Sequence, residues 1–306
     1  MAYDVSALSS YVNEQSDKYL YQTIAEGTTT SLIPNVQSGI KSSEKIKMIS
    51  TTGVWQAGGS CGFNASGDTS FSDRTLAVGK VKVNLKWCPK DLEPKYTQLK
   101  LKKGSAYKNL DFEEQIVAQL QNKDKSKVEQ VVWNGDTTSG DAYLSKFDGF
   151  RKIIGAASGV LTASTSGSTT WNQTNSRTIM QAFAAKVSAS LPQLLEDDDA
   201  VCFMGVKEAV DLKLKYIADN LFHITGEEGV LKVEGTEIKI IPVQGLSGKG
   251  EVYLMRKSNM YLGVDLEGED DKMEIFFAKE ADEIRYVKEF KMGVQIAFPD
   301  EIIKHI

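Results

Sequence analysis

The chain has 306 residues, of which 41% are hydrophobic and 25% charged, and its formal net charge is −5 at pH 7. This is the composition of an ordinary globular chain that is long enough for one to three compact units with a substantial core. The mild acidity argues against a dedicated nucleic-acid-binding protein, which usually carries a basic patch or stripe.

Targeting signals and a disulfide framework are not apparent. The sequence starts Met-Ala-Tyr-Asp, without the basic start and apolar run of a signal peptide, and no stretch approaches the length of a membrane span. The cysteines at 61, 88 and 202 are odd in number and form no metal-type or redox-type pair, and Cys61 alone is expected to be exposed. We therefore expect a chain that is made and used in a reducing cytoplasm.

The N-terminal region has a weak helical pattern followed by a connector. Apolar residues within 3–26 predict an amphipathic helix, which packs either on its own domain or on a neighbouring subunit. Residues 31–40 contain Pro34 and Gly39 and are expected to be extended, because proline removes a donor and disfavours helix before it.

Residues 43–88 contain two strand-like segments separated by a glycine-rich tract at 57–68. In the second segment, four apolar residues alternate with polar ones: Val81, Val83, Leu85 and Trp87. The alternation changes phase near Gly79, which predicts a β-bulge there. An isolated two-stranded ribbon is marginally stable in water, so this ribbon needs a partner surface. That surface is either a neighbouring subunit or the chain's own domain.

A long helix is predicted from Asp111 to Trp133. Asp111 and Glu114 form a helix-start signal, and apolar residues recur at helical spacing near both ends. The intervening stretch 121–127 is entirely polar and is expected to face water or another chain. It carries Lys123, Lys125 and Lys127 against one acidic residue. Gly135 is expected to close the helix in the left-handed conformation.

The remainder predicts a mixed α/β unit and then one long strand. Residues 155–174 are a spacer rich in Ser, Thr and Gly. Helices are expected from 175 or 176 and over 206–220, and strands over 201–204, 230–233, 237–243 and 251–255. From Ile284 to Phe298 apolar residues occupy even positions, interrupted only by Lys288, which predicts a strand of roughly 50 Å.

Signals for catalysis, cofactors and metals are weak. His223 and His305 are the only histidines, and neither is expected to be catalytic, because a Ser-His-Asp or Cys-His site would have to use His223 alone. Residues 245–250 precede a strand, so they predict a turn and no phosphate loop. The acidic stretches 197–199 and 265–271 lack the spacing of a calcium loop and are expected to be solvated turns. We expect no catalytic, cofactor-binding or metal site.

The long helix ending in Asn134-Gly-Asp136, followed by Phe147-Asp-Gly-Phe150, resembles the spine helix region of tailed-phage major capsid proteins with the Hong Kong 97 fold. An arm and a long two-stranded loop before this helix, and a mixed domain and a long strand after it, follow the same order. The resemblance covers nearly the whole chain, and the order of elements carries it, because the helix-Asn-Gly-Asp motif also occurs in unrelated proteins.

The resemblance implies an α+β capsid fold with a long spine helix and long strands. Its parts would be an N-terminal arm at 1–42, an extended loop at 43–92, a peripheral domain at 93–155 and 273–306, and an axial domain at 156–272. It implies a non-enzymatic subunit of an icosahedral phage head that encloses double-stranded DNA. Copies would form hexamers and pentamers in the bacterial host cytoplasm, with a separate scaffolding protein, a portal and no membrane as further expectations.

Two sets of contact residues follow from this resemblance. Val81, Val83, Leu85 and Trp87 would contact a neighbouring subunit across the extended loop. Lys123, Lys125 and Lys127 would contact packaged DNA, an acidic patch on the scaffold or an adjoining subunit, or they would be solvated. Two alternatives remain at the level of function: an encapsulin-type nanocompartment with the same fold, and a soluble α/β enzyme that uses acidic residues.

Overall fold

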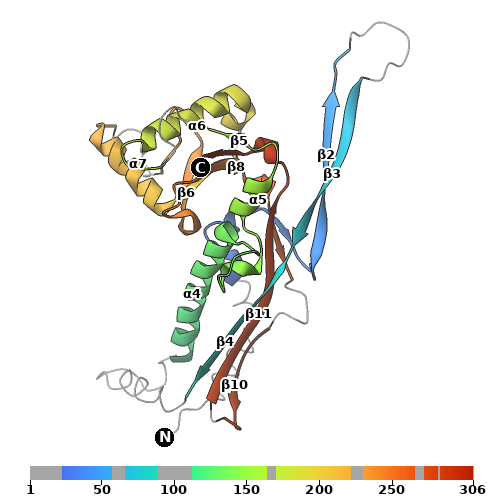
Figure 1. Ribbon diagram of the computed structural model, residues 1–306, viewed down its shortest axis with the longest axis vertical. Helices are drawn as coiled ribbons and strands as arrows, with labels where there is room; N and C mark the ends of the chain where they lie inside the picture. Colours follow the sequence, from blue (N-terminus) through green and yellow to red (C-terminus); the bar gives the residue numbers. More distant parts are fainter. Residues whose placement is uncertain are drawn as a thin grey trace.

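The computed structural model describes residues 23–56, 66–88, 112–163, 170–221, 230–265, 272–281 and 283–305, but not the side chains of 112–118 and 272. The described part of the chain is long and narrow (Figure 1). It contains two five-stranded sheets and one two-stranded ribbon. One sheet packs with a long helix in an elongated unit, and the other sheet packs with further helices in a mixed unit.

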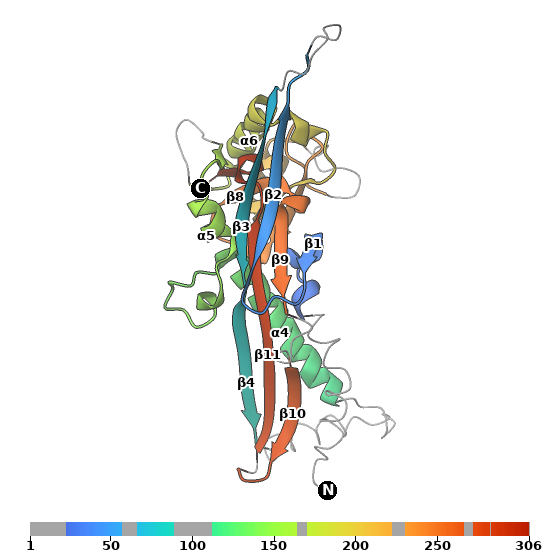
Figure 2. The same ribbon diagram turned by 90° about the vertical axis from the view of Figure 1, so that its right-hand side faces the viewer.

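The elongated unit is built on β11 (Glu283–Ile296), the long final strand. The first half of β11 is flanked by β10 (Lys272–Ala278) and β4 (Gly79–Trp87), both antiparallel to it (Figure 2). Its second half pairs with β9 (Met260–Val264), and β9 pairs in parallel with β1 (Asn35–Gln37). With 14 residues at about 3.3 Å each, β11 spans roughly 46 Å, close to the predicted length.

Helix α4 (Phe112–Asn134) lies alongside this sheet and matches the predicted helix to within one residue at each end (Figure 1). Its last turns bury Val128, Val131, Val132 and Trp133. The Trp133 ring lies 5.4, 5.3 and 5.7 Å from the ring centroids of Phe150, Phe203 and Tyr253. Because Phe203 and Tyr253 come from strands of the mixed unit, Trp133 joins the cores of both units.

The expectation that 121–127 faces water or another chain is only partly right. Gln121 is buried, and Asp124 and Lys125 are paired with other parts of the same chain. The helix lies against the sheet along this stretch, and the charged Asp124 and Lys125 are retained there because each forms an ion pair, whereas Nε2 of the buried Gln121 has no hydrogen-bond partner among the described residues.

Gly135 ends α4, but the left-handed conformation predicted for it is wrong, because Gly135 is not among the glycines with positive φ. Glycine is needed there for a close approach: a Cβ at Gly135 would lie 2.3 Å from the carbonyl oxygen of Phe147. The amide of Gly149 donates to the carbonyl of Gly135 at 2.9 Å, and α5 (Phe150–Ala156) starts immediately afterwards.

The mixed unit has a sheet in the order β5-β12-β8-β6-β7. Its strands are β5 (Leu161–Thr162), β6 (Ala200–Gly205), β7 (Lys239–Val243), β8 (Val252–Arg256) and β12 (Ile303–His305). One face contacts the core around α4, and the other packs on α6 (Ser176–Ser190) and α7 (Val206–Ala218). The predicted strand at 230–233 is wrong, since only an isolated bridge forms at Lys232.

The C-terminal strand corrects the expected division of the chain. β12 pairs with β5 and β8, so the last residues of 273–306 belong to the mixed sheet and not to the elongated unit. Short 3-10 helices connect the larger elements at η1 (Thr30–Leu32), η2 (Leu144–Lys146), η3 (Pro192–Leu195), η5 (Gln244–Leu246), η6 (Lys257–Asn259) and η7 (Pro299–Glu301).

The ribbon consists of β2 (Ser43–Gly53) and β3 (Gly67–Ala77), paired from end to end without a bulge. Its base is anchored by a small core of Ile40, Ile46, Met48, Leu76 and Ala297. The predicted return strand is therefore wrong: β3 returns, and β4, which begins at Gly79, leaves the ribbon to join β11. The change of phase near Gly79 marks this switch between sheets and not a bulge. A Cβ at Gly79 would lie 1.9 Å from the carbonyl oxygen of Lys146, so glycine is required for the crossing.

Candidate assembly groove

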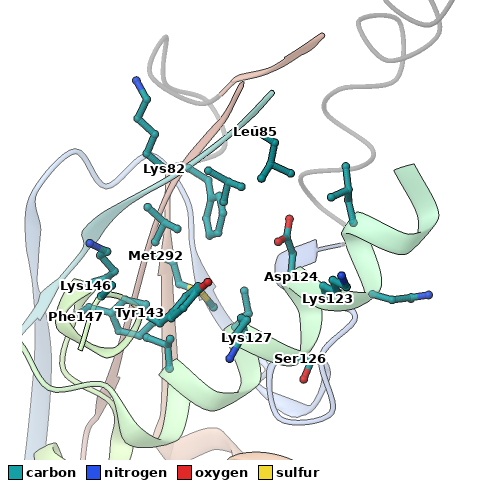
Figure 3. Close-up of a pocket in the computed structure, with 18 residues that line it drawn as sticks. Lys82, Leu85, Lys123, Asp124, Ser126, Lys127, Tyr143, Lys146, Phe147 and Met292 are labelled. Atoms are coloured by element: carbon teal, nitrogen blue, oxygen red, sulfur yellow. The ribbon is translucent and has the colours of Figure 1, made fainter. Parts of the chain in front are cut away.

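A groove of about 810 Å³ lies between α4 on one side and β4 and β11 on the other, with η2 at one end (Figure 3). Its floor is apolar and comprises Val81, Val83, Leu85, Leu120, Val128, Val131, Phe147, Phe290 and Met292. Four lysines also line it: Lys82, Lys123, Lys127 and Lys146. We call the first set the floor and the second set the lysine rim.

The floor combines the apolar face of strand β4 with the apolar stripe of helix α4. On β4, alternate residues point to the same face, so Val81, Val83 and Leu85 are half-buried while Lys82 and Asn84 between them are exposed. On α4, Val128 and Val131 are three residues apart and occupy the facing stripe. The antiparallel pairing of β4 with β11 then places Phe290 opposite Val81.

One buried ion pair lies below the groove. The side chain of Lys288 on β11 is fully buried, and its Nζ lies 2.8 Å from Oδ2 of Asp124 on α4. The same ammonium donates to Thr23 Oγ1 at 2.8 Å. Burial lowers the pKa of Lys288, and the carboxylate of Asp124 opposes that shift. The lysine that interrupts the apolar pattern of β11 is therefore a link between helix and strand.

The structure places most of the sequence-predicted contact residues in this one groove. Val81, Val83 and Leu85 line its strand side, and Lys123 and Lys127 line its helix side (Figure 3). Trp87 lies beyond the groove, with its ring 6.2 Å from that of Tyr286. Lys125 also lies outside the lining and pairs with Glu26 at 2.5 Å. The four strand residues contact the core of their own chain, and their contact with a neighbouring subunit stays a prediction.

Sequence reasoning missed several of the residues that define the groove. Lys82 and Lys146 are rim residues that carried no motif, and Lys288 was read only as an interruption. The available signal was the single lysine within the apolar even positions of 284–298, because a charge on a buried face requires a partner.

A second polar contact fixes α4 to the N-terminal segment. Both Thr29 backbone and side chain donate to the Glu129 carboxylate, and Trp133 Nε1 donates to Thr29 Oγ1 at 2.7 Å. Burial raises the pKa of Glu129, and the hydrogen bonds from Thr29 partly oppose the shift. This network ties the last turns of α4, which form part of the helical wall of the groove, to Thr29.

None of the residues that line the groove is a histidine or a cysteine. His305 is buried with its Nδ1 3.3 Å from the carbonyl oxygen of Ala163, whereas His223 and Cys61 lie outside the described residues. Across the described ranges, no cluster of three or more His, Cys, Asp or Glu is placed to hold a metal ion. No helix in those ranges is both long and apolar enough to cross a membrane.

The acidic stretches are engaged within the chain where they are described. Asp197 pairs with Arg256 at 2.5 Å, and Asp265 pairs with Lys291 at 2.6 Å. Asp265 and Lys291 are both buried, so the first residue of the acidic stretch is not the solvated turn residue that we expected. Residues 266–271 lie outside the described residues.

Comparison with known proteins places the fold. No protein-family model matches the sequence, and no curated protein sequence matches it. Solved structures do match: the satellite phage P4 procapsid (11% identity, 94% of this chain and 90% of that chain, TM-score 0.63) and Gordonia phage Cozz (9% identity, 91% and 85%, TM-score 0.57). The virus-like particle of Pyrococcus furiosus also matches, with 11% identity, 98% of each chain covered and a TM-score of 0.52.

These likenesses extend over nearly the whole of this chain and of the matched chains. At such low identity they concern the arrangement of elements and not individual residues. The order of elements on which the sequence-based resemblance rests is found in the described part of this chain: the ribbon, the long helix, the mixed unit and the long strand. The chain has the α+β fold of tailed-phage major capsid proteins, the Hong Kong 97-like fold.

Proposed function

We propose that this chain is the structural subunit of a closed protein shell, a phage major capsid protein that assembles into hexamers and pentamers. The observation that carries the proposal is the ribbon β2–β3, which projects from the rest of the described chain (Figure 1). Only its base packs on a core. A ribbon of this kind needs a partner surface for most of its length.

The ribbon carries apolar side chains in solvent. Ile49 and Phe71 face each other across the strands and are 61% and 76% exposed. Val54 and Trp55 near its tip are 56% and 99% exposed. Burying one such large side chain contributes about 1.5–3 kcal/mol, so a neighbouring copy that covers this face would gain several such contributions.

The mixed unit carries a second apolar surface, on α7. Val206, Val210, Leu214 and Ile217 recur at helical spacing and are 43%, 50%, 44% and 53% exposed. The α7 surface and the ribbon lie on different parts of the molecule (Figure 1). Two separate and non-equivalent contact surfaces favour head-to-tail contacts with more than one neighbour, the arrangement that builds rings and shells.

The test is a double substitution in the ribbon, Ile49→Asp with Phe71→Asp. Both side chains are exposed in the single chain, so we expect the subunit to fold as the parent does while particle formation is lost. The matched control, Ser50→Asp with Ser70→Asp, changes the neighbouring cross-strand pair on the opposite face and should assemble. Light scattering and electron microscopy measure assembly, and circular dichroism measures folding. Normal particles from the first variant would contradict the proposed role of the ribbon.

The finer function that we propose is a head enclosing double-stranded DNA, assembled in the bacterial cytoplasm with a separate scaffolding protein and a portal. The likeness to a phage procapsid supports it. A nanocompartment that holds cargo protein is the second candidate, supported by the likeness to the Pyrococcus furiosus particle over 98% of each chain. Nuclease-protected DNA in particles from the native source would support the head, and a co-purifying enclosed protein without DNA would support the compartment.

A further inference from the structure

We propose that the groove between α4 and β4 is a docking site for an acidic amphipathic helix of a separate protein. This inference rests on the proposed shell function and names the chemistry of one partner for the subunit. The groove is the place where the apolar floor and the lysine rim, noted separately in the sequence, lie together (Figure 3).

The floor requires an apolar partner. Val81, Val83 and Leu85 pack on their own core from one side yet still line the open groove. Phe147, Phe290 and Met292 are almost fully buried, so they make the base rigid. A preformed apolar groove of this kind favours a ligand that presents apolar side chains along one face.

The rim specifies the charge of the partner. Asp124 is the one carboxylate among the lining residues, and it pairs with the buried Lys288. Lys82 pairs with Glu289 on the exposed side of the sheet, and Lys127 lies 4.7 Å from the centroid of the Tyr143 ring. Within the described residues, Lys123 and Lys146 form no ion pair. In a chain of net charge −5, this local excess of lysine favours a partner with carboxylates beside its apolar face.

A helix fits this groove better than a strand or a nucleic acid does. β11 is hydrogen-bonded on both flanks, whereas β4 pairs only with β11 among the described strands, so its outer edge is open. The groove, however, is lined by Val81, Val83 and Leu85, whose side chains project from the sheet face, so a ligand in it meets side chains and not the backbone edge that an added strand needs. A DNA duplex presents phosphates to lysines but has no apolar stripe for the floor. An amphipathic helix supplies apolar side chains to the floor and carboxylates to the rim together.

The experiment uses the full-length chain and two synthetic helical peptides of about 18 residues, or five turns. Both peptides share one Leu/Phe face; the polar face is Glu-rich in one and Lys-rich in the other. Fluorescence anisotropy should detect the Glu-rich peptide alone, and its affinity should fall as salt rises. A photoreactive group on its apolar face should cross-link to β4 or β11, as read by mass spectrometry.

The charge-reversal variant is Lys123→Glu, Lys127→Glu and Lys146→Glu. Exposed charge pairs each contribute little, so reversing three together should weaken Glu-rich peptide binding by roughly tenfold to a hundredfold at low salt. The matched control replaces Lys207, Lys213 and Lys249, all exposed and outside the groove, by Glu and should bind as the parent does. Circular dichroism verifies that both variants are folded.

Several outcomes would overturn the proposal. Equal binding of both peptides would show that the rim has no role, and cross-links elsewhere would show that the groove is not the site. Preferential binding of a DNA duplex that competes with the Glu-rich peptide would make the ligand a nucleic acid. Binding only after deletion of residues 1–22 would make the chain's own N-terminal segment the occupant. Particle formation is scored separately, so a chain that assembles without binding the peptide loses this inference and keeps the shell function.

Discussion

Replacing Asp124 by Asn tests the buried ion pair that joins α4 to β11. The substitution keeps the shape of the side chain and removes its charge, leaving the fully buried Lys288 ammonium with a neutral partner. Two charges about 4 Å apart attract by about 4 kcal/mol at an effective dielectric constant of about 20. Removing one partner of a buried pair typically costs about 3–5 kcal/mol. Because the side chain of Asp124 is 19% exposed, water partly compensates, and we expect a loss of about 3 kcal/mol in the free energy of unfolding.

This loss should depend on pH. Burial lowers the pKa of Lys288 below its ordinary 10.5, and Asp124 opposes the shift, so Asp124→Asn should lower that pKa further. Between the lowered value and 10.5 the unfolded chain binds more protons than the folded one, so stability rises with pH across that interval. In Asp124→Asn the pH interval between the lowered pKa of Lys288 and 10.5 is wider, because that pKa is lower still. The deficit of this variant relative to the parent should therefore be largest at neutral pH and shrink as the pH rises towards 10.5.

The assay is urea denaturation of unassembled subunits at a series of pH values, for the parent, Asp124→Asn, Lys288→Met and the double variant. The double variant should be more stable than Asp124→Asn alone, since it removes the unpaired buried charge. A cost below about 1 kcal/mol for Asp124→Asn at neutral pH would refute the reasoning, because that is the range of exposed pairs. A double variant no more stable than Asp124→Asn would refute it as well.

Three other perturbations test the fold. Val83→Asp puts a charge against the chain's own core. It should lower the free energy of unfolding of the unassembled subunit by about 2–4 kcal/mol. An unchanged urea midpoint would contradict the placement of β4 against that core. Arg151→Met removes the guanidinium that donates two hydrogen bonds to the Glu251 carboxylate, whose side chain is only 10% exposed. The free energy of unfolding, measured by urea denaturation, should fall by about 2–4 kcal/mol. A fall below about 1 kcal/mol would show that this ion pair does not stabilise the fold. Hydrogen bonds from Lys152 and then Thr138 lower the pKa of Asp136 from 3.8 to about 2, so the stabilisation from this carboxylate is present above 3.8 and lost as the pH falls to about 2. The difference in urea midpoint between the parent and Asp136→Asn should shrink over that interval, and a constant difference would contradict the assignment.

The elements that the sequence determined are those whose periodicity is local and long. α4 follows from apolar residues at helical spacing, and β11 follows from apolar residues at even positions over 14 residues. α6 starts at Ser176, as predicted. The end of α4 was placed to within one residue, at Asn134 instead of Trp133, although Gly135 serves close packing and not a left-handed φ.

Strand pairing was not determined by the sequence. The polar, β-capable stretch 67–77 returns along β2, whereas the strongly alternating stretch 79–87 leaves to pair with β11. Alternation shows that a strand has one apolar face, but it does not show which strand pairs with it, because the partner lies about two hundred residues away in the chain. The short strands β9 and β10, which also pair with β11, were not predicted either, although β10 directly precedes β11 in the chain.

For the groove too, some features follow from the sequence and others only from the tertiary structure. The sequence by itself marked Val81, Val83 and Leu85 as one apolar face and Lys123 and Lys127 as part of a basic stretch, since both patterns depend on near neighbours. Only the tertiary structure decided that they share one groove, because that depends on β4 pairing with β11 and on α4 lying against both. It also gave Lys288 its role: a lysine within an apolar strand is retained when a carboxylate from a distant helix meets it, and that meeting is fixed by packing and not by any local pattern.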